Sequence, residues 1–506
     1  MLLHEHFERA AQRLAAKTAL VVGEHRIGYG ELHRRVRALA DALRADGVQP
    51  GDRVLVMLEA GAEFAIAVHA VLRAGAVFVP VSAQTKADKL AFLAGDTRAT
   101  ALLTQASLVA HWRAARSQVP GPVSCRVHGG EAALEDGERP WPADDAAGSP
   151  EMAPRIDLDL AAIIYTSGTT GRPKGVMLSH LNMRSAWDSV QAYLGLREDD
   201  VIGLALPPVY SYGLYNLLMG LGLGATVVIE RQAAFPLRLA QTLERERVTV
   251  FPGVPTLYAA LLGVAQIERF DFGALRLLTN AAAALPLAHL ERVRRLWPQA
   301  RLYSMYGLTE CKRVSYLPPD QLEARPGSVG RGMPNQEHWL VDDEGRRLPH
   351  GSTGELVVRG CHVMLGYWER PEETAERLRP GPLPGQTVLH TGDLFRSDAE
   401  GYLYFVARRD DIIKTRGEKV APREVENAIY RLEGVTGCAV VGVPDELLGQ
   451  AVKAYVTLAP GCTLGEREII RHCLAHLESH MAPKSVAVVA ELPRTESGKI
   501  RHASLR

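Results

Sequence analysis

Residues Ile163 to His180 read "IIYTSGTTGRPKGVMLSH", an apolar run that breaks into a loop of small residues with two cations, Arg172 and Lys174. The apolar run is typical of a buried strand. A following loop of Gly, Ser and Thr can turn backbone N–H groups and hydroxyls toward one anion, and a lysine beside it adds a positive charge. The pattern predicts a phosphate site, with a surface turn as the alternative for the loop taken alone.

The loop does not match the P-loop of common nucleotide-binding proteins. A Walker A motif needs a glycine, four residues, and then Gly-Lys followed by Ser or Thr. Counting from Gly168, Pro173 stands where the second glycine must be, and Gly175 follows Lys174 in place of a hydroxyl residue. Since no kinase motif is found either, a phosphotransferase is disfavoured.

Length and composition are those of a large globular protein. The chain has 506 residues, of which 47% are hydrophobic and 23% charged, far from the composition of a disordered protein. This length predicts about three compact units, or one large α/β body with an appendage. Lys plus Arg and Asp plus Glu both total 58, so the charge gives no sign of nucleic acid or an anionic membrane as the main partner.

The cysteines and the N-terminus favour a cytoplasmic protein. The six cysteines are scattered, and none forms a CxxC pair or a metal-ligand spacing with histidines. The first twenty residues carry His4, Glu5 and Glu8 where a signal peptide would need an apolar core. No apolar run is long enough and uninterrupted enough to span a bilayer, while a peripheral membrane association stays open.

The order of patterns along the chain predicts a large α/β body followed by a small lobe. From about Thr18 to Val119, short apolar runs alternate with helix-like segments, as in βαβ units. Residues 119–154 lack periodicity and are interpreted as a surface excursion of the chain, that is, a loop outside the core. The alternation then resumes to about Ala407, and the last hundred residues predict a small α+β lobe, with the charged cluster of residues 408–411 as its hinge.

The opening motif resembles the phosphate-binding signature of the adenylate-forming superfamily: acyl-CoA synthetases, adenylation domains of peptide synthetases, and luciferase. Later motifs of that superfamily follow in its order, and together they cover the chain from about residue 20 to 503. They are "YGLTE" (306–310), "TGD" (391–393), "RRDDIIKTRGEKVAPREVE" (408–426) and "ESGKI" (496–500). A single motif could arise by chance, but five in order are specific to the family.

The resemblance implies ATP and Mg²⁺ as cofactors and assigns a role to each motif. In the implied first reaction a carboxylate attacks the α-phosphate of ATP to give an acyl-adenylate and pyrophosphate, so two anions must be neutralised and aligned. Tyr306 would stack on adenine, Thr309 would hydrogen-bond the α-phosphate, and Glu310 would help to bind Mg²⁺. Asp393 would accept both ribose hydroxyls and Arg408 would reach the ribose or phosphate. The residues implied to cradle the phosphates are Thr166, Ser167, Gly168, Thr169, Thr170, Gly171 and Lys174.

The implied second reaction passes the acyl group to a thiol and uses the small lobe. Lys499 resembles the catalytic lysine of the adenylation step, and Asp410 lies at the family's hinge. After rotation of the lobe, Gly417 would line the thiol tunnel. Two departures occur: the glycine usual before the hinge arginine is Ala407, and the asparagine usual before Gly-Lys is Ser497. The missing glycine suggests altered hinge mobility.

The acid substrate is predicted from the segment "PPVYSYGLYNLL", residues 207–218. Amino-acid-activating relatives place an aspartate here to pair with the substrate ammonium, and an ungapped comparison puts Ser211 at that position. No Asp or Glu lies between Gly203 and Ile229, so an ordinary α-amino acid is disfavoured. Lys312 and Arg313 are either surface charges or an attraction for a second anionic group. The predicted acyl pocket, which suits an aryl or modest aliphatic acid, consists of Tyr210, Ser211, Tyr215, Tyr303 and Met305.

These observations together predict a freestanding ATP-dependent acid–thiol ligase. It would make an acyl-AMP from an aryl or aliphatic acid and pass the acyl group to the phosphopantetheine thiol of coenzyme A or of a carrier protein. The predicted fold is α/β, with a large N-terminal body over residues 1–409 and a mobile C-terminal lobe over residues 410–506. Two alternatives remain: an amino-acid adenylating enzyme that loads a carrier in trans, and a nucleotide-binding protein without catalytic activity.

Overall fold

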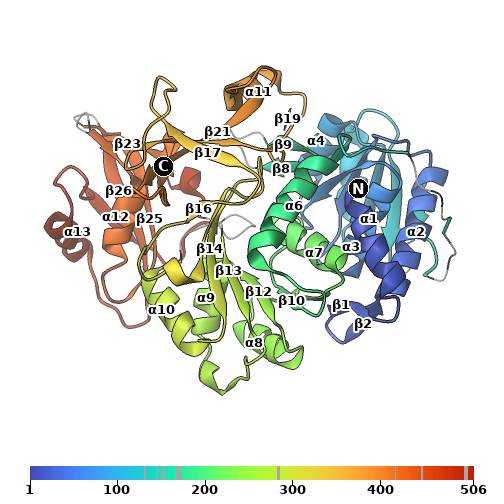
Figure 1. Ribbon diagram of the computed structural model, residues 1–506, viewed down its shortest axis with the longest axis horizontal. Coiled ribbons are helices and arrows are strands. Elements are labelled where there is room, and N and C mark those ends of the chain that lie inside the picture. The colour runs from blue at the N-terminus through green and yellow to red at the C-terminus, as the bar shows by residue number, and fades with distance from the viewer. Residues whose placement is uncertain are drawn as a thin grey trace.

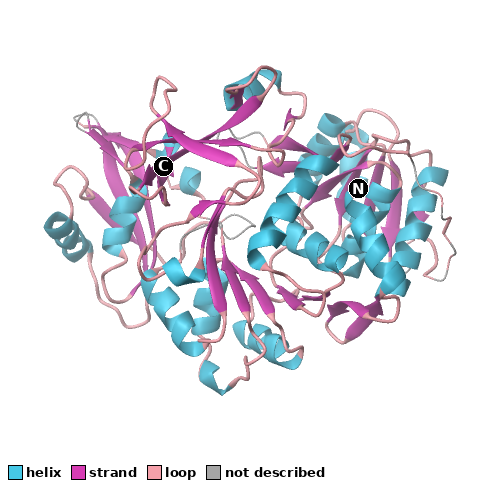
Figure 2. Ribbon diagram, viewed as in Figure 1, coloured by secondary structure: helices cyan, strands magenta, loops and turns pink. Residues whose placement is uncertain are grey.

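A computed structural model of the protein (Figures 1 and 2) contains several mixed sheets with helices packed on their faces. The structure describes residues 1–129, 133–144, 146, 148–149, 151, 154–166, 173–281, 285–415, 418–445, 448–494 and 500–505, without the side chains of 410, 419 and 503. The thirteen helices of this part are α1 (Leu3–Arg13), α2 (Tyr29–Ala45), α3 (Ala62–Arg73), α4 (Ala87–Thr97), α5 (Val109–Ala115), α6 (His180–Leu194), α7 (Ser211–Leu223), α8 (Pro236–Arg245), α9 (Pro255–Leu262), α10 (Leu287–Leu296), α11 (Pro371–Arg377), α12 (Pro422–Ile429) and α13 (Glu466–His476).

The first sheet has nine strands, and its six central strands are parallel. Short antiparallel strands close both edges. In one of the parallel pairs, Leu278 is the register partner of Leu302. Because the central strands are parallel, their carboxyl ends lie at the same end of the sheet. In spatial order the strands are β16 (Arg331–Gly332), β15 (Ser315–Leu317), β14 (Arg301–Tyr306), β13 (Leu277–Asn280), β12 (Val250–Gly253), β10 (Val201–Leu204), β11 (Thr226–Ile229), β1 (Thr18–Val22) and β2 (His25–Gly28).

The second sheet has eight strands and carries the opening motif at its antiparallel edge. The strands from β8 to β7 run parallel, whereas β9 pairs antiparallel with β8 and with β19. In spatial order the strands are β19 (Gly366–Tyr367), β9 (Lys174–Ser179), β8 (Leu160–Thr166), β4 (Val77–Val81), β3 (Arg53–Met57), β5 (Ala101–Gln105), β6 (Ser124–His128) and β7 (Glu138–Pro140).

The interpretation of residues 119–154 as surface excursion is partly wrong. The segment contributes β6 and β7 at the far edge of the second sheet. Cys125 and Val127 alternate into the core with 1% and 3% exposure. Because β5 already presents a row of unpaired backbone groups, it can recruit a short strand whose own sequence carries little periodicity.

The two large sheets share one core with the helices between them. Buried residues of α1, α3, α6 and α7 form a single cluster with strands of both sheets. Nearly every residue of α3 is buried, which explains why its sequence is apolar on all sides rather than along one stripe. Figure 1 shows α6 and α7 lying between the two sheets.

The remaining chain forms a small antiparallel sheet and the C-terminal lobe. The third sheet contains β17 (Glu337–Val341), β18 (Thr353–Arg359), β21 (Thr387–Ser397), β20 (Leu378–Pro380) and β22 (Leu403–Arg408). A one-turn helix over Arg409–Asp411 leads into the last sheet. That sheet contains β24 (Glu418–Val420), β23 (Ile413–Thr415), β26 (Gly449–Leu458), β25 (Val435–Asp445) and β27 (Ser485–Val488).

The C-terminal lobe has a hydrophobic core of its own, in which α12 and α13 pack on the sheet. The predicted fold class, a large α/β body followed by a small α+β lobe, is confirmed. Among the described residues, no helix has the length and apolar character that crossing a membrane requires.

Candidate active site

The opening motif lies on an antiparallel hairpin. Strand β8 ends at Thr166 and strand β9 begins at Lys174, and these two residues are register partners. The Thr166 hydroxyl donates to the Lys174 carbonyl oxygen at 3.5 Å. Ser167, Gly168, Thr169, Thr170 and Gly171 lie outside the described residues. The hairpin therefore fixes both ends of the predicted phosphate loop on sheet strands.

Tyr367 joins the opening motif to the carboxylate of "YGLTE". Its hydroxyl donates to Glu310 Oε1 at 2.8 Å, and Lys174 Nζ lies 5.5 Å from the centroid of its ring. Strand β19, which carries Tyr367, pairs with β9 beyond the hairpin. Burial and the neighbouring Glu310 raise the pKa of the Tyr367 hydroxyl, which keeps it a donor. Two predicted site residues distant in sequence are thus brought together by a residue that the sequence analysis missed.

A second cluster brings together Tyr306, Asp393 and Arg408. The Tyr306 hydroxyl donates to Asp393 Oδ2 at 2.5 Å, and Arg408 Nε lies 3.5 Å from Asp393 Oδ1. Asp393 and Arg408 are register partners on β21 and β22. Burial raises the pKa of Asp393 although Arg408 opposes it. The rings of Phe395 and Tyr306 make a T-shaped contact, with centroids 4.7 Å apart.

Thr309 lies in the turn between these two clusters. It follows β14 and is half-buried, with Tyr306 on one side in sequence and Glu310 on the other. The carbonyl oxygen of Glu310 accepts from Met364 N at 2.8 Å, which holds the turn against the chain entering β19. Thr309 is thus positioned between the predicted adenine side and the predicted metal side of the site.

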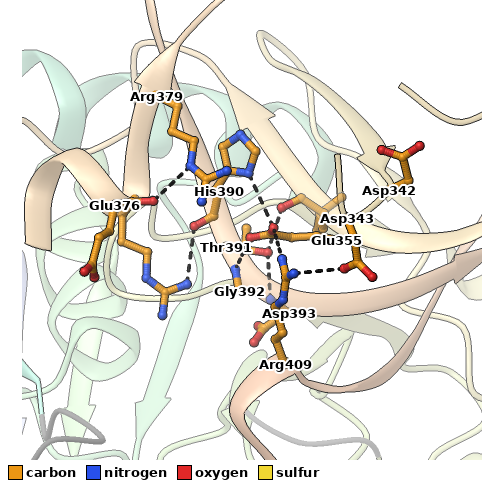
Figure 3. A network of polar contacts seen from close by, with 12 residues as sticks. Asp342, Asp343, Glu355, Glu376, Arg379, His390, Thr391, Gly392, Asp393 and Arg409 are labelled. Carbon is orange, nitrogen blue, oxygen red and sulfur yellow. Dashed lines mark hydrogen bonds and ion pairs between the residues drawn. The ribbon is translucent and has the colours of Figure 1, made fainter. Parts of the chain in front are cut away.

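A polar network next to Asp393 anchors the residues that precede it and Arg409 on the way to the last sheet (Figure 3). Glu355 accepts from Gly392 N at 2.9 Å, and Arg409 reaches Glu355 at 3.3 Å and Asp343 at 2.9 Å. Burial favours the neutral acid, but hydrogen bonds from His390 and Gly392 outweigh it and lower the pKa of Glu355. The carboxylate is therefore ionised and holds Arg409, the residue immediately before the predicted hinge.

The predicted acyl-pocket residues gather around the start of α7 and the end of β14. Tyr210 precedes α7 and Ser211 begins it, and both are half-buried. Tyr215, Tyr303 and Met305 are at most 3% exposed. The structure adds neighbours that the sequence analysis did not assign to the pocket: Tyr193, which donates to the Met305 sulfur at 3.1 Å, Tyr316, stacked on Tyr193 at 3.9 Å, and Thr279, bound by the Tyr212 hydroxyl at 2.6 Å.

The remaining predicted residues belong to the C-terminal lobe. Asp410 lies in the one-turn helix Arg409–Asp411, and its side chain is outside the described part. Gly417 and Lys499 also lie outside the described residues. The hinge, thiol-tunnel and catalytic-lysine assignments therefore stay predictions from the sequence.

The cation of Lys174 and the carboxylate of Glu310 lie on one side of the "YGLTE" turn. The ring of Tyr306, the carboxylate of Asp393 and the guanidinium of Arg408 lie on the other side. Such an arrangement can hold a polyanion by its cationic and metal-binding side and a ribose by Asp393, which retains oxygen lone pairs for hydroxyl donors. This combination of groups, with a separate cluster of tyrosines at the start of α7, fits the joining of a nucleotide phosphate to a second small molecule.

Comparisons with known proteins agree with this assignment. The family described as "AMP-binding enzyme" matches residues 7–368, and "AMP-binding enzyme C-terminal domain" matches residues 424–499. A feruloyl-CoA synthase from Amycolatopsis sp is 34% identical over 98% of this chain and 97% of its own length.

Two solved structures superpose over the whole chain. The anthranilate CoA ligase AuaEII in complex with anthranoyl-AMP has a TM-score of 0.90 and 28% identity, covering 100% of this chain and 96% of that one. ATP-bound MatB from Rhodopseudomonas palustris has a TM-score of 0.88 and 30% identity, covering 100% and 98%.

The fold and the site define an adenylate-forming enzyme. The chain belongs to the AMP-binding enzyme family, which confirms the resemblance drawn from its five motifs. It is an AMP-forming acid–thiol ligase that uses ATP to activate a carboxylic acid and coenzyme A as the thiol substrate.

Proposed function

We propose that the protein activates an aryl or modest aliphatic carboxylic acid as its acyl-adenylate and then transfers the acyl group to a phosphopantetheine thiol. The convergence of Lys174, Tyr367 and Glu310 on one side of the "YGLTE" turn and of Tyr306, Asp393 and Arg408 on the other carries this proposal. The tyrosines around the start of α7 support an aryl acid, since aromatic side chains stack well on a ring.

The residues have distinct roles in binding ATP. The hairpin loop with Thr166 and Lys174 would neutralise the β- and γ-phosphates, Tyr306 would stack on adenine, and Asp393 with Arg408 would hold the ribose. Thr309 would donate to the α-phosphate. Thr166, Lys174, Tyr306, Asp393 and Arg408 lie on strands, and such preorganised groups make charge stabilisation effective.

Mg²⁺ would bind through Glu310. In the described part of the chain, no group of three or more His, Cys, Asp or Glu side chains is arranged so that it could hold a metal ion by itself. This fits Mg²⁺, which is usually held by one or two carboxylates together with substrate phosphates and water. When bound, the ion would neutralise phosphate charge, and Tyr367 would orient the carboxylate toward it.

A freestanding amino-acid adenylating enzyme is the alternative, and the pocket argues against it. Ser211 stands where a carboxylate would pair with the substrate ammonium, and its carbonyl oxygen accepts from Lys312 Nζ at 3.0 Å. A second cation placed beside this lysine would be repelled, and a buried ammonium without its carboxylate is strongly penalised.

We propose residues 1–409 and 410–506 as the two domains, with Asp410 as the hinge. Lys499 would reach the reacting carboxylate and α-phosphate in one orientation of the lobe, and Gly417 would approach the thiol in the other. Lys499→Ala should block adenylation while leaving thioester formation from supplied acyl-AMP largely intact. Equal loss of both steps would refute this division.

The acceptor and the location form the rest of the proposal. Besides coenzyme A, the phosphopantetheine arm of a carrier protein would also receive the acyl group. We place the protein in the cytoplasm, because its six cysteines are free thiols.

The test is ATP-dependent pyrophosphate release across aryl acids, short, medium and long aliphatic acids, and amino acids, each with and without coenzyme A. Release with an aryl or modest aliphatic acid followed by a coenzyme A thioester is expected. Adenylation without that thioester would point to a carrier protein. Release with amino acids alone would overturn the interpretation of Ser211.

A further inference from the structure

Two adjacent cations, Lys312 and Arg313, are buried against the acyl pocket. They are 5% and 4% exposed. Lys312 Nζ lies 4.3 Å from the centroid of the Tyr215 ring, and Arg313 Cζ lies 5.0 Å from that of Tyr212. Both tyrosines belong to α7, so the cations lie where "YGLTE" leads into the segment predicted to select the acid.

Neither cation has an anionic partner among the described residues. The polar partner of Lys312 is the Ser211 carbonyl oxygen, and Arg313 Nε is buried without a hydrogen bond. No ion pair with an Asp or Glu involves either side chain in the described part. Elsewhere in the protein, the equally buried Arg73 pairs with Glu8. The facing segment from Gly203 to Ile229 contains no acidic residue that could serve.

The arrangement is electrostatically incomplete. Tyrosine faces attract a desolvated cation by about 2 kcal/mol, whereas removing an ion from water costs several kcal/mol even after relaxation. Burial, together with repulsion from Arg313, lowers the pKa of Lys312 well below its usual range. An anion placed between the two side chains would remove this penalty.

The backbone holds the cations at this point despite strain. Lys312 adopts φ +58°, a left-handed conformation that is unfavourable for a residue with a side chain. Val314 N donates to the Tyr306 carbonyl oxygen at 2.9 Å, which ties the turn to β14. Gly307 makes the close approach possible, because a Cβ there would lie 2.3 Å from the Lys312 carbonyl oxygen. Strained positions of this kind tend to occur at functional sites.

We propose that the acid substrate carries a second carboxylate, which Lys312 and Arg313 bind at the end remote from the carboxylate that is activated. The substrate class is therefore a dicarboxylic acid, short enough to reach from the "YGLTE" turn to α7. This inference rests on the proposed function and narrows its substrate. Tyr212 and Tyr215 would flank the distal carboxylate, and the guanidinium of Arg313 would supply paired donors to its oxygens.

The first experiment compares matched acids with the wild-type protein. Pyrophosphate release is measured with benzene-1,4-dicarboxylic acid and its monomethyl ester, and with glutaric acid and its monomethyl ester. We expect kcat/KM for each diacid to exceed that for its ester by roughly 100-fold, the change typical of a lost charge-assisted contact in a buried site. The effect should fall mainly on KM, because the distal group is remote from the reacting atoms.

Variants then assign the preference to the two cations. Lys312→Met and Arg313→Met should each reduce the preference for diacid over ester to within about tenfold, through a higher KM for the diacid. Arg301→Met is the matched control: Arg301 also stacks on a tyrosine of this cluster, Tyr303, at 5.5 Å, but it is exposed. It should leave the preference unchanged.

The outcomes separate this inference from the proposed function. Pyrophosphate release with the monoesters at a rate equal to or above that of the diacids would overturn the inference and leave the acid ligase intact. Failure of every acid in the panel would contradict both. The comparison of diacid and ester uses the wild-type protein, so it decides the question even where a variant does not fold.

Discussion

Tyr367 is the residue that turns two separate motifs into one site. Its hydroxyl binds Glu310 and its ring lies beside Lys174. Tyr367→Phe keeps the ring and removes the hydrogen bond, so Glu310 loses the contact that orients it. We expect kcat to fall by about tenfold, equivalent to about 1.4 kcal/mol, and the Mg²⁺ concentration needed for half-maximal activity to rise.

Tyr29→Phe is the control for this prediction. It likewise removes a hydroxyl from a buried tyrosine, one that donates to the Ala225 carbonyl oxygen at 2.6 Å away from the site. This variant should lower Tm with no change in the Mg²⁺ requirement. If Tyr367→Phe needed the same Mg²⁺ concentration for half-maximal activity as the wild type, Tyr367 would contribute to packing and not to the orientation of Glu310.

Asp393 is predicted to contribute to the affinity for ATP rather than to the stability of the fold. Asp393→Asn keeps the shape but removes the charge that faces Arg408 and weakens acceptance of ribose hydroxyls. KM for ATP should rise by about 10- to 100-fold in a pyrophosphate-exchange assay. Asp398→Asn provides the comparison, because Asp398 follows the end of the same strand but pairs with Arg325 at 2.7 Å. It should leave KM for ATP unchanged, and an equal rise in both variants would contradict the assignment.

At the level of elements, the hairpin β8–β9 depends on Gly175. A Cβ at this position would lie 2.6 Å from Ile163 Cγ2 and 3.1 Å from the Tyr165 ring on the neighbouring strand. Gly175→Ala should therefore destabilise the protein by about 1–3 kcal/mol and raise KM for ATP, since the same hairpin holds Lys174. Thermal unfolding and pyrophosphate exchange measure the two effects.

Gly95→Ala tests whether the effect at Gly175 belongs to the hairpin. Gly95 lies within α4, and a Cβ there would meet only Pro120 Cδ, at 3.6 Å. Alanine in a helix interior is favoured over glycine, so this variant should be as stable as the wild type or more so. If Gly175→Ala behaved like Gly95→Ala, the hairpin would not require the glycine.

The elements best predicted from the sequence are those with strong local patterns. The alternation of short apolar runs with helix-like segments between Thr18 and Val119 corresponds to strands such as β3 and β4 and helices such as α2. Strands β6 and β7 were missed because their pairing is supplied by a neighbouring strand rather than by their own periodicity.

The residues of the candidate site also divide into those that short sequence motifs predict and those that only the folded structure reveals. The motif residues Lys174, Tyr306, Glu310, Asp393 and Arg408 could be assigned from their short-range context and order. Tyr367, Thr279 and Tyr193 could not, because their roles arise from strand pairing and packing between distant segments. The pair of cations at Lys312 and Arg313 was visible in the sequence, but only burial distinguishes a binding group from a surface charge.

For the whole molecule, the proposed rotation of the C-terminal lobe requires that the ribose-binding residues be held rigidly by the large body. Asp393 and Arg408 lie on paired strands, and Arg409 is held by Glu355 and Asp343 just before the lobe begins. The last fixed point of the large body is therefore one residue from the proposed hinge at Asp410. A rotation of the lobe would leave the ribose-binding side of the site in place, which two successive reactions on one bound intermediate require.

Buried neutral histidines make the stability of the whole molecule depend on pH. Burial lowers the pKa of His69, His180 and His362 to about 4. In the unfolded chain these side chains take up protons near pH 6.5, whereas in the folded protein they do not until about pH 4. The unfolded state therefore binds more protons in this window, and stability falls as the pH is lowered from about 6.5 toward 4.

Each such histidine contributes at most about 1.4 kcal/mol of lost stability per pH unit within that window. His362 is the sharpest test, because both of its ring nitrogens are buried without a hydrogen bond. His362→Met should reduce the fall in Tm between pH 7 and pH 5.5 relative to the wild type, while the exposed His25→Gln should leave it unchanged. If Tm of the wild type stayed constant over this range, the buried histidines would have to accept protons in the folded protein, and the core that joins the two large sheets would be less dry than its packing indicates.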